Sequence, residues 1–329
     1  MDIVDTLMGA LRTGLGLSGA VYAVAGIGLN LHFGYTGLLN FGHAGFLLVG
    51  AYGLGVTVDQ GGPFLLGVAV GIIACIILAL ILGIPTLRLR ADYLAITTIA
   101  ASEILRLVTR ARTFEDYTGG VFGLNRIADA FYAANPLPDG TYGFGSLTYS
   151  HNLAWVILVT WAIAILFAVT LWLLMRSPWG RVIKAIREDE DAARSLGKNV
   201  FAYKMQSLVI GGVMGGVAGM MFAIGIQNLR ADFFDPLFTF FIYAVVILGG
   251  PATIWGPIAG SILFWAIISF SAGFMGDLVD AGVLSSAIFS DQDVGAFRFV
   301  VVGLGLMALM VWRPQGLFGR REEMLLDAR

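Results

Sequence analysis

Long stretches without a charged residue alternate with short polar ones along the whole chain. One helical crossing of a bilayer needs about 20 consecutive apolar residues. The charge-free runs are residues 13–58, 63–84, 151–175, 205–229 and 236–276. The first and last are long enough for two crossings each, divided at the polar, glycine-bearing residues 32–37 and at Gly249-Gly250-Pro251. With further crossings at 93–110 and 299–312, the pattern predicts about nine transmembrane helices.

The apolar runs are solid rather than alternating in polarity. Strands of a membrane barrel alternate, so this pattern predicts helices. The composition agrees, because 58% of the residues are hydrophobic, 13% are charged and the mean hydropathy is +0.84, whereas soluble domains have roughly a quarter charged residues. The fold class is therefore predicted to be all-α, a polytopic transmembrane helix bundle in which residues 1–329 form a single domain.

Basic residues predict the orientation, because they accumulate in short cytoplasmic loops. Most of the twenty Lys and Arg residues lie in 85–92, in 176–204 and in 313–329. We therefore expect a cytoplasmic loop at 176–204, a cytoplasmic tail at 313–329 and an N-terminus on the outside. The predicted extracytoplasmic loop at 110–150 and the loop around Asp277 carry acidic residues, although 110–150 also contains three arginines.

The sequence of the loop at 176–204 predicts a helix rather than a flexible connector. Ser177-Pro178 is a helix start, Val182, Ile183 and Ile186 share one apolar face, and Leu196-Gly197 is a stop signal. The helix could lie on lipid headgroups. The alternative is that its apolar face docks into a groove on another protein that supplies energy, since the chain has no phosphate-binding loop of the type GxxxxGK[ST].

A family resemblance appears in this loop. Residues 180–197 (GRVIKAIREDEDAARSLG) resemble the cytoplasmic coupling loop of the permeases of branched-chain amino-acid ABC transporters, with Asp in place of the Glu of the usual Glu-Ala-Ala…Gly signature. Residues 34–46 (GYTGLLNFGHAGF), 118–124 (TGGVFGL) and 249–260 (GGPATIWGPIAG) are similar to other motifs of that family. The resemblance implies that coupling to an ATPase involves Arg181, Ile183, Ile186, Arg187, Asp191, Ala192, Ala193 and Gly197.

The same resemblance implies the partners. They are ABC ATPase subunits that bind ATP and Mg, a sister H-type permease in a heterodimer, an extracytoplasmic solute-binding protein and membrane lipid, but no nucleic acid. The loop at 110–150 and the TGG motif favour the M-type subunit, whereas Asn40-Phe41-Gly42-His43 leans toward the H-type. The chain is expected to be a transport subunit without a cofactor of its own, not an enzyme, in a bacterial or archaeal cytoplasmic membrane with a cytoplasmic C-terminus.

Polar residues within apolar helices are costly and mark candidate substrate sites. The candidates for the substrate pathway are Asn30, Asn40, His43, Glu103, Arg106, Thr118, Gly119 and Gly120. Each has a simpler interpretation: Asn and His, including His32, could bridge helices, Glu103 and Arg106 could form an ion pair near the outer interface, and the TGG motif could be only a turn. Three scattered histidines and one cysteine make no metal-ligand set.

The glycines at 211, 215 and 219 recur every four residues and predict close helix packing. We expect the chain to move a branched-chain or related hydrophobic amino acid into the cytoplasm, driven by ATP hydrolysis in other subunits. The alternatives are a urea or short-amide permease of the same type, and an ion-coupled secondary transporter that works alone. The secondary transporter would leave the cytoplasmic helix unexplained.

Overall fold

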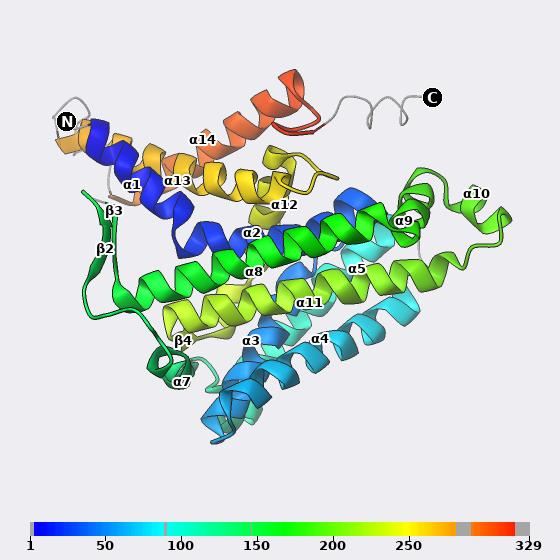
Figure 1. The fold of residues 1–329 in the computed structure, drawn as a ribbon, viewed down its shortest axis with the longest axis horizontal. Helices are drawn as coiled ribbons and strands as arrows, with labels where there is room; N and C mark the ends of the chain where they lie inside the picture. The colour runs from blue at the N-terminus through cyan, green and yellow to red at the C-terminus, as the bar shows by residue number, and fades with distance from the viewer. Residues whose placement is uncertain (1–2, 89–90, 146, 281–290, 320–329) are drawn as a thin grey trace.

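The computed structural model describes residues 3–88, 91–145, 147–280 and 291–319 of the chain. The fold is a bundle of helices that lie side by side (Figure 1). The long elements are α1 (Ile3–Leu15), α2 (Leu17–Asn30), the π-helix η1 (Leu31–Thr36), α3 (His43–Asp59), α4 (Phe64–Thr86), α5 (Ala91–Arg110), α8 (His151–Arg176), α11 (Val200–Ile226), α12 (Pro236–Gly249), α13 (Gly256–Asp280) and α14 (Asp291–Trp312).

Five helical segments in the described residues are long and apolar enough to cross a bilayer. They are Leu17–Thr36, Phe64–Thr86, His151–Arg176, Val200–Ile226 and Gly256–Asp277. The predicted class, a helical membrane bundle, is confirmed. The count of about nine crossings stays a prediction, because α3, α12 and the apolar part of α14 are shorter and α5 carries more charge.

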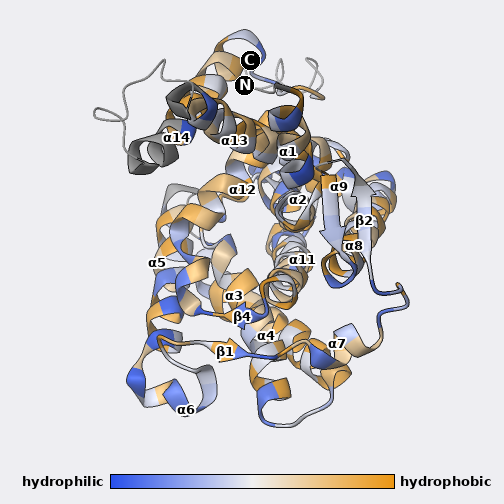
Figure 2. Ribbon diagram, turned by 90° about the vertical axis from the view of Figure 1, so that its left-hand side faces the viewer, coloured by the Kyte–Doolittle hydropathy of each residue, from blue (hydrophilic) through white to orange (hydrophobic). Residues whose placement is uncertain are grey.

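The helix α11 lies at the centre of the bundle when the molecule is viewed end-on (Figure 2). It packs against α2, α3 and α4, while α1 packs along α13. Glycine explains the close approach, because a Cβ at Gly211 would lie 2.6 Å from the Gly28 carbonyl oxygen and one at Gly219 would meet the Leu47 backbone. The predicted packing role of this glycine row is confirmed.

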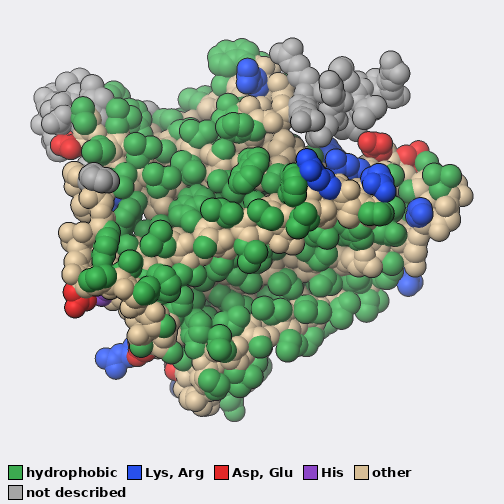
Figure 3. All heavy atoms as spheres, in the orientation of Figure 1, with side chains coloured by type: hydrophobic (Ala, Val, Ile, Leu, Met, Phe, Trp, Pro, Cys, Tyr) green, Lys and Arg blue, Asp and Glu red, His purple; other side chains and the backbone are tan. Residues whose placement is uncertain are grey.

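The two ends of the bundle differ. We name one the coupling end, after the role expected of residues 176–204, and the other the loop end, after the loops that it holds. The coupling end holds two short helices, α9 (Pro178–Glu188) and α10 (Glu190–Ser195) (Figure 1), and several Lys and Arg side chains gather on the surface at this end (Figure 3). The loop end holds η2 (Arg112–Phe114), α6 (Glu115–Thr118), α7 (Asp129–Ala133) and η3 (Ala231–Phe234), together with all four strands.

The strands are short additions to an otherwise helical fold. β1 (Leu124–Asn125) pairs antiparallel with β4 (Asn228–Leu229), which joins the predicted outer loop to the end of α11. β2 (Thr141–Phe144) and β3 (Leu147–Ser150) form an antiparallel hairpin. The predicted loop at 110–150 is therefore an ordered cap over the loop end rather than a plain connector.

Both predicted interruptions of the long apolar runs are present. In the first run the chain leaves the helix after η1 and resumes at α3, and in the last run α12 ends before α13 begins. A third interruption, at Gly16 between α1 and α2, was not predicted. Of the predicted outer and inner segments, residues 281–290 and 320–329 lie outside the described residues.

Candidate functional site

The first interruption of the helices places a group of polar side chains inside the bundle. Asn30, His32, Thr36, Asn40 and His43 are all at most 2% exposed. The helix widens into a π-turn over LHFGYT and ends at Gly37, whose φ of 74° is the left-handed conformation that favours glycine. Residues 37–42 then connect η1 to α3 without regular helical hydrogen bonding, and the Leu38 and Asn40 amides donate instead to the His32 and Leu38 carbonyls.

His32 is fixed in one orientation by its neighbours. Its Nε2 lies 3.2 Å from the Ser207 carbonyl and 3.3 Å from the Leu208 carbonyl, and its Nδ1 lies 3.2 Å from Asn40 Nδ2. Carbonyls only accept and the amide NH2 only donates, so Nε2 carries the proton and Nδ1 accepts. This geometry describes a neutral imidazole that joins η1 to α11 and to the segment before α3.

His43 is less completely satisfied. Its Nε2 donates to the Ala25 carbonyl at 3.1 Å, and its ring lies 5.6 Å from the His32 ring in an edge-on arrangement. Its Nδ1 is buried and has no hydrogen-bond partner among the described residues. Two glycines of α11 make room for the imidazoles, because a Cβ at Gly211 would meet His32 and one at Gly215 would lie 2.7 Å from His43.

Hydroxyl groups complete this polar core. Thr36 Oγ1 donates to the Leu31 carbonyl at 2.8 Å, so the 2.6 Å bond between Thr36 and Ser207 has Ser207 as its donor. Two more hydroxyl groups accept hydrogen bonds from the backbone around the start of α3. The Phe41 amide donates to Thr98 Oγ1 at 3.1 Å, and the Ala44 amide donates to Thr239 Oγ1 at 2.9 Å. Segments far apart in the sequence therefore converge on the first interruption.

Asn30 links the first interruption to the second. Its Oδ1 accepts from the Ala252 amide at 2.9 Å, and its Nδ2 donates to the Thr253 carbonyl at 2.7 Å. A Cβ at Gly34 would occupy the place of the Asn30 amide oxygen, so this clamp requires glycine there. The second interruption is also held by the chain after α14, where the Leu317 amide donates to the Leu248 carbonyl at 3.0 Å.

The predicted coupling helix is two helices. Ser177 Oγ caps α9 by accepting from the Gly180 amide at 3.4 Å, with Pro178 in the first turn. Asp189 has extended backbone and starts α10, because its carboxylate accepts from the Asp191 and Ala192 amides at 2.9 Å each. Gly197 follows α10 with a φ of 75° and open space around it. The predicted start and stop are confirmed, and the predicted continuity is wrong.

The apolar face of α9 points into this chain. Ile183 is fully buried, and Ile186 is 3% exposed in a cluster with Ala193 and Val200. The prediction that this face enters a groove on another protein is therefore wrong, because the bundle itself covers it. Of the predicted coupling residues, Arg181, Arg187, Asp191 and Ala192 are exposed on these helices, and Gly197 is exposed just after α10.

α9 lies directly against η1, the π-turn that begins the first interruption. Lys184 Nζ is 5.9 Å from the centre of the Tyr35 ring, which is itself buried. A Cβ at Gly37 would lie 3.4 Å from Arg187 Cγ. A displacement of α9 would therefore act on the same short segment that carries His32 and Thr36.

Glu103 and Arg106 form an ion pair, as their spacing predicts, but within a larger network. Arg106 Nη2 lies 2.6 Å from Glu103 Oε1 and its Nε donates to Oε2 at 2.9 Å. Asp232 in η3, which the sequence did not indicate, lies 2.7 Å from Arg106 Nη1 and 3.3 Å from Arg110 Nη1. No described hydrogen bond or ion pair joins this network to His32 or His43.

The TGG motif forms a rigid turn at the loop end. Thr118 Oγ1 donates to the Phe114 carbonyl at 2.8 Å and accepts from the Gly120 amide at 3.3 Å. Gly119 and Gly120 have φ of 70° and 54°, so both occupy left-handed backbone. The turn exposes Phe122, which is 76% accessible. The structure thus separates the predicted pathway residues into a buried core and two features nearer the loop end.

Within the described residues, no group of three or more His, Cys, Asp and Glu side chains could hold a metal ion. The polar core is built from neutral donors and acceptors, and the ionised groups of the Glu103 network are each paired with a group of opposite charge. The polar core therefore joins segments that lie far apart in the sequence.

Comparison with known proteins gives concordant matches. The sequence model of the family described as "Branched-chain amino acid transport system / permease component" matches residues 13–310. The LivM permease of Escherichia coli is 31% identical, covering 90% of this chain and 67% of LivM. The probable LivM permease of Methanocaldococcus jannaschii is 28% identical, covering 90% of both chains.

The LivH permease of Escherichia coli is more distant, at 26% identity over 92% of this chain and 93% of LivH. Among solved structures, PsaBC from Streptococcus pneumoniae in complex with Fab overlaps 98% of this chain and 95% of its own, with 16% identity and a TM-score of 0.42. The greater identity to LivM agrees with the M-type features of the sequence. The chain belongs to the branched-chain amino acid transport permease family, as an M-type membrane permease of an ABC importer and not as an enzyme.

Proposed function

We propose that this chain is one of two permease subunits that together carry branched-chain amino acids into the cytoplasm. The relatives whose names state branched-chain amino acid transport support this substrate class. The observation that carries the mechanism is the contact of α9 with η1, because η1 holds the buried polar core. A movement imposed on α9 would be passed to the interrupted helix, which is where a small zwitterion would find free backbone groups.

In this proposal the coupling end faces the cytoplasm. Its exposed residues Arg181, Arg187, Asp191, Ala192 and Gly197 would contact ATPase subunits, which bind ATP and Mg. The buried residues Ile183, Ile186 and Ala193 would support this surface by fixing α9 and α10 to the bundle. The tail after α14 would lie on the same side, in the cytoplasmic or inner membrane of a bacterium or archaeon.

The loop end would then face the binding protein that delivers the substrate. The turn at Thr118, Gly119 and Gly120 is rigid and presents an exposed aromatic ring, which suits a contact with a folded partner. The network of Glu103 and Arg106 lies in the helix just below it and would hold the walls of the entrance in place. A sister H-type permease would complete the path from the other side.

The substrate would pass beside the first interruption. Phe41 stacks on Tyr243 at 4.6 Å and lies 5.6 Å from Phe240, which is 46% exposed, so aromatic surface is available there for an aliphatic side chain. Asn40 and His43 adjoin this surface, and Asn30 fixes the second interruption behind it. Polar groups for the zwitterion and an apolar wall for the side chain are thus adjacent.

The test is uptake by proteoliposomes that contain this chain, an H-type permease, the ATPase subunits and a binding protein. We expect accumulation of radiolabelled leucine that requires ATP hydrolysis and that excess valine suppresses but urea and acetamide do not. Suppression by urea or acetamide alone would assign the chain to the amide alternative. Uptake driven by a proton or sodium gradient without ATP would overturn the proposal.

A further inference from the structure

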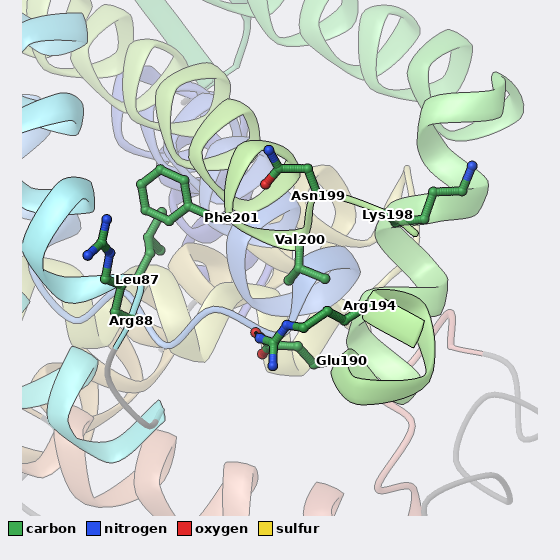
Figure 4. Close-up of a pocket in the computed structure, with 8 residues that line it drawn as sticks. All are labelled: Leu87, Arg88, Glu190, Arg194, Lys198, Asn199, Val200 and Phe201. Carbon is green, nitrogen blue, oxygen red and sulfur yellow. Dashed lines mark hydrogen bonds and ion pairs between the residues drawn. The ribbon is translucent and has the colours of Figure 1, made fainter. Parts of the chain in front are cut away.

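A cavity of about 720 Å³ opens at the coupling end, outside the polar core and outside the exposed face of α9. It lies between the end of α4, represented by Leu87 and Arg88, and the segment from α10 to the start of α11 (Figure 4). Arg88 enters from one side next to Phe201, and Arg194 lies with Glu190 on the other (Figure 4). Nothing in the transport proposal uses this cavity.

The lining of this cavity is positively charged. Three cations, Arg88, Arg194 and Lys198, and one acidic residue, Glu190, line it, and the Lys198 side chain extends away from the other lining residues (Figure 4). Glu190 is already bound by Arg194 at 3.0 Å and by Lys204, and Arg194 also contacts Asp191 at 3.1 Å. Among the described side chains, no carboxylate lies within ion-pair distance of Arg88 or Lys198, and the Arg88 guanidinium lies 5.7 Å from the Phe201 ring centre. The cavity therefore favours an anion.

The start of α11 adds to this preference. Val200 and Phe201 are the first residues of a 27-residue helix, and both line the cavity. The N-terminus of a helix carries a partial positive charge that attracts phosphate and other anions. Two of the first amides of α11 are already bonded, because the Val200 amide donates to the Lys198 carbonyl at 3.0 Å and the Ala202 amide to Asn199 Oδ1 at 3.1 Å. The cations and the positive end of the helix dipole therefore both favour an anion in the cavity.

An apolar stripe on α4 leads to the cavity. Ile73, Ile77, Ile81 and Ile84 are each at least 50% exposed and are spaced by three or four residues, so they lie on one face of the helix. Arg88 follows Ile84 by four more residues. The stripe from Ile73 to Ile84 is about 16 Å long at 1.5 Å per residue, close to half of the roughly 30 Å hydrocarbon core.

We propose that the cavity binds the headgroup phosphate of an anionic phospholipid. Its acyl chains would follow the isoleucine stripe of α4, which spans one leaflet. Its phosphate would lie beside Arg88, and the exposed Lys198 side chain would turn toward it from the opposite rim. Basic pockets beside transmembrane helices bind anionic headgroups in this way. The lipid would join α4 to α10, so that it binds next to the helices proposed to couple to ATP hydrolysis. The proposal rests on the membrane placement of α4 and not on the identity of the transported substrate.

The test uses the full-length chain in nanodiscs of phosphatidylcholine with a minor fraction of phosphatidylglycerol, examined by native mass spectrometry. We expect the R88Q/K198Q double variant to lose one tightly retained phosphatidylglycerol per chain, with binding about thirtyfold weaker from the loss of two cations. The R88K/K198R swap, which keeps both charges, should retain the lipid. If the double variant does not fold, K198Q alone should weaken retention about fivefold.

The matched control is R176Q. Arg176 lies at the coupling end of α8 with its guanidinium 4.0 Å from the Trp172 ring centre, so it is also a cation beside an aromatic ring but lines no part of this cavity. Unchanged lipid retention in R88Q/K198Q, or equal loss in R176Q, would overturn the proposal. The proposal would also be overturned if inorganic phosphate fully replaced the lipid. It would likewise be overturned if R88Q/K198Q lost the co-purifying ATPase subunits while the lipid stayed bound.

Discussion

Arg106 distributes its donor groups over two segments of the chain. Its Nε and Nη2 contact Glu103 on the same helix, and its Nη1 contacts Asp232 on η3. The guanidinium is thus occupied on each of its three nitrogens, which leaves no free edge for the carboxylate of a substrate. This geometry favours the simpler of the two interpretations of the Glu103–Arg106 pair, a structural tie that holds α5 to the segment before α12.

We therefore expect Glu103→Gln to lower thermal stability and not substrate affinity. The change removes one of two carboxylates from a partly exposed network, and such pairs contribute up to about 1 kcal/mol each. Asp232→Asn should have an effect of similar size, because it releases the same guanidinium. Melting temperature and the apparent KM for leucine uptake are the two measurements. An increase of KM at unchanged stability would instead place Glu103 in the substrate path.

At the scale of elements, the important junction is between α9 and η1. A π-turn is a wide and irregular helical turn that often marks a functional position. Here it carries buried polar side chains on one side and touches α9 at Gly37 on the other. If α9 transmits movement through this contact, the two elements must move together rather than slide past each other.

A disulfide can test whether they do. A Cβ built at Gly37 lies 3.9 Å from Arg187 Cβ, within the usual 3.5–4.5 Å range for disulfides. In the Gly37→Cys/Arg187→Cys variant, we expect oxidation to leave ATP-driven uptake within about twofold of the reduced protein, because the bond links two parts of one moving unit. The native Cys75 is fully buried and will not interfere.

The single variant Gly37→Cys is the control for backbone strain, since a side chain in left-handed backbone costs roughly 1–2 kcal/mol. Loss of uptake on oxidation that returns on reduction, and that occurs only in the double variant, would show that α9 and η1 separate during the cycle. The proposed transmission through Gly37 would then be wrong.

At the scale of the whole molecule, the two ends offer a matched pair of glycines. Gly197 after α10 and Gly61 after α3 both have positive φ, 75° and 81°, and both have open space where a side chain would go. Their substitution therefore imposes the same local strain. They differ in their place, since Gly197 lies at the coupling end and Gly61 follows α3 at the loop end.

We expect Gly197→Arg to abolish ATP-driven leucine uptake and to weaken co-purification of the ATPase subunits by at least about tenfold, whereas Gly61→Arg should retain both. The reason is that an arginine at 197 projects into the surface proposed to contact the ATPase. Membrane insertion, measured by the yield of monodisperse protein, should be equal in the two variants. Equal losses in both would mean that strain, not contact, explains the effect.

Part of this fold could be predicted from the sequence because a bilayer imposes strict rules on local composition. The charge-free runs predicted the positions of the long helices, and the glycine-bearing segments at 32–37 and 249–251 predicted where the helices are interrupted. The break between α9 and α10 could also have been found, since Asp189 before Glu190 is a helix-start signal. Contacts between distant segments could not be predicted in this way. Nothing in the local sequence indicates that Ser207 contacts Thr36 or that Asp232 contacts Arg106.

The apolar face of α9 shows a second limit of sequence reasoning. The spacing of Ile183 and Ile186 indicates that one side of the helix is buried, but it does not say by what. The structure shows that the bundle of this chain covers it. The surface that we propose for coupling is therefore the exposed polar and glycine-bearing side of α9 and α10, which no hydrophobic pattern would indicate.

The glycines that accommodate the two imidazoles have a consequence for how this family can change over time. The rings of His32 and His43 occupy space that exists only because positions 211 and 215 of α11 lack side chains. A larger residue at 215 is tolerable only when His43 becomes smaller, whereas a Cβ at 211 would also lie 2.6 Å from the Gly28 carbonyl oxygen, which no change at 32 removes. Positions 215 and 43 should therefore change as a coupled pair across homologues, with their combined volume more constant than the identity of either residue, while position 211 should stay glycine whatever residue stands at 32.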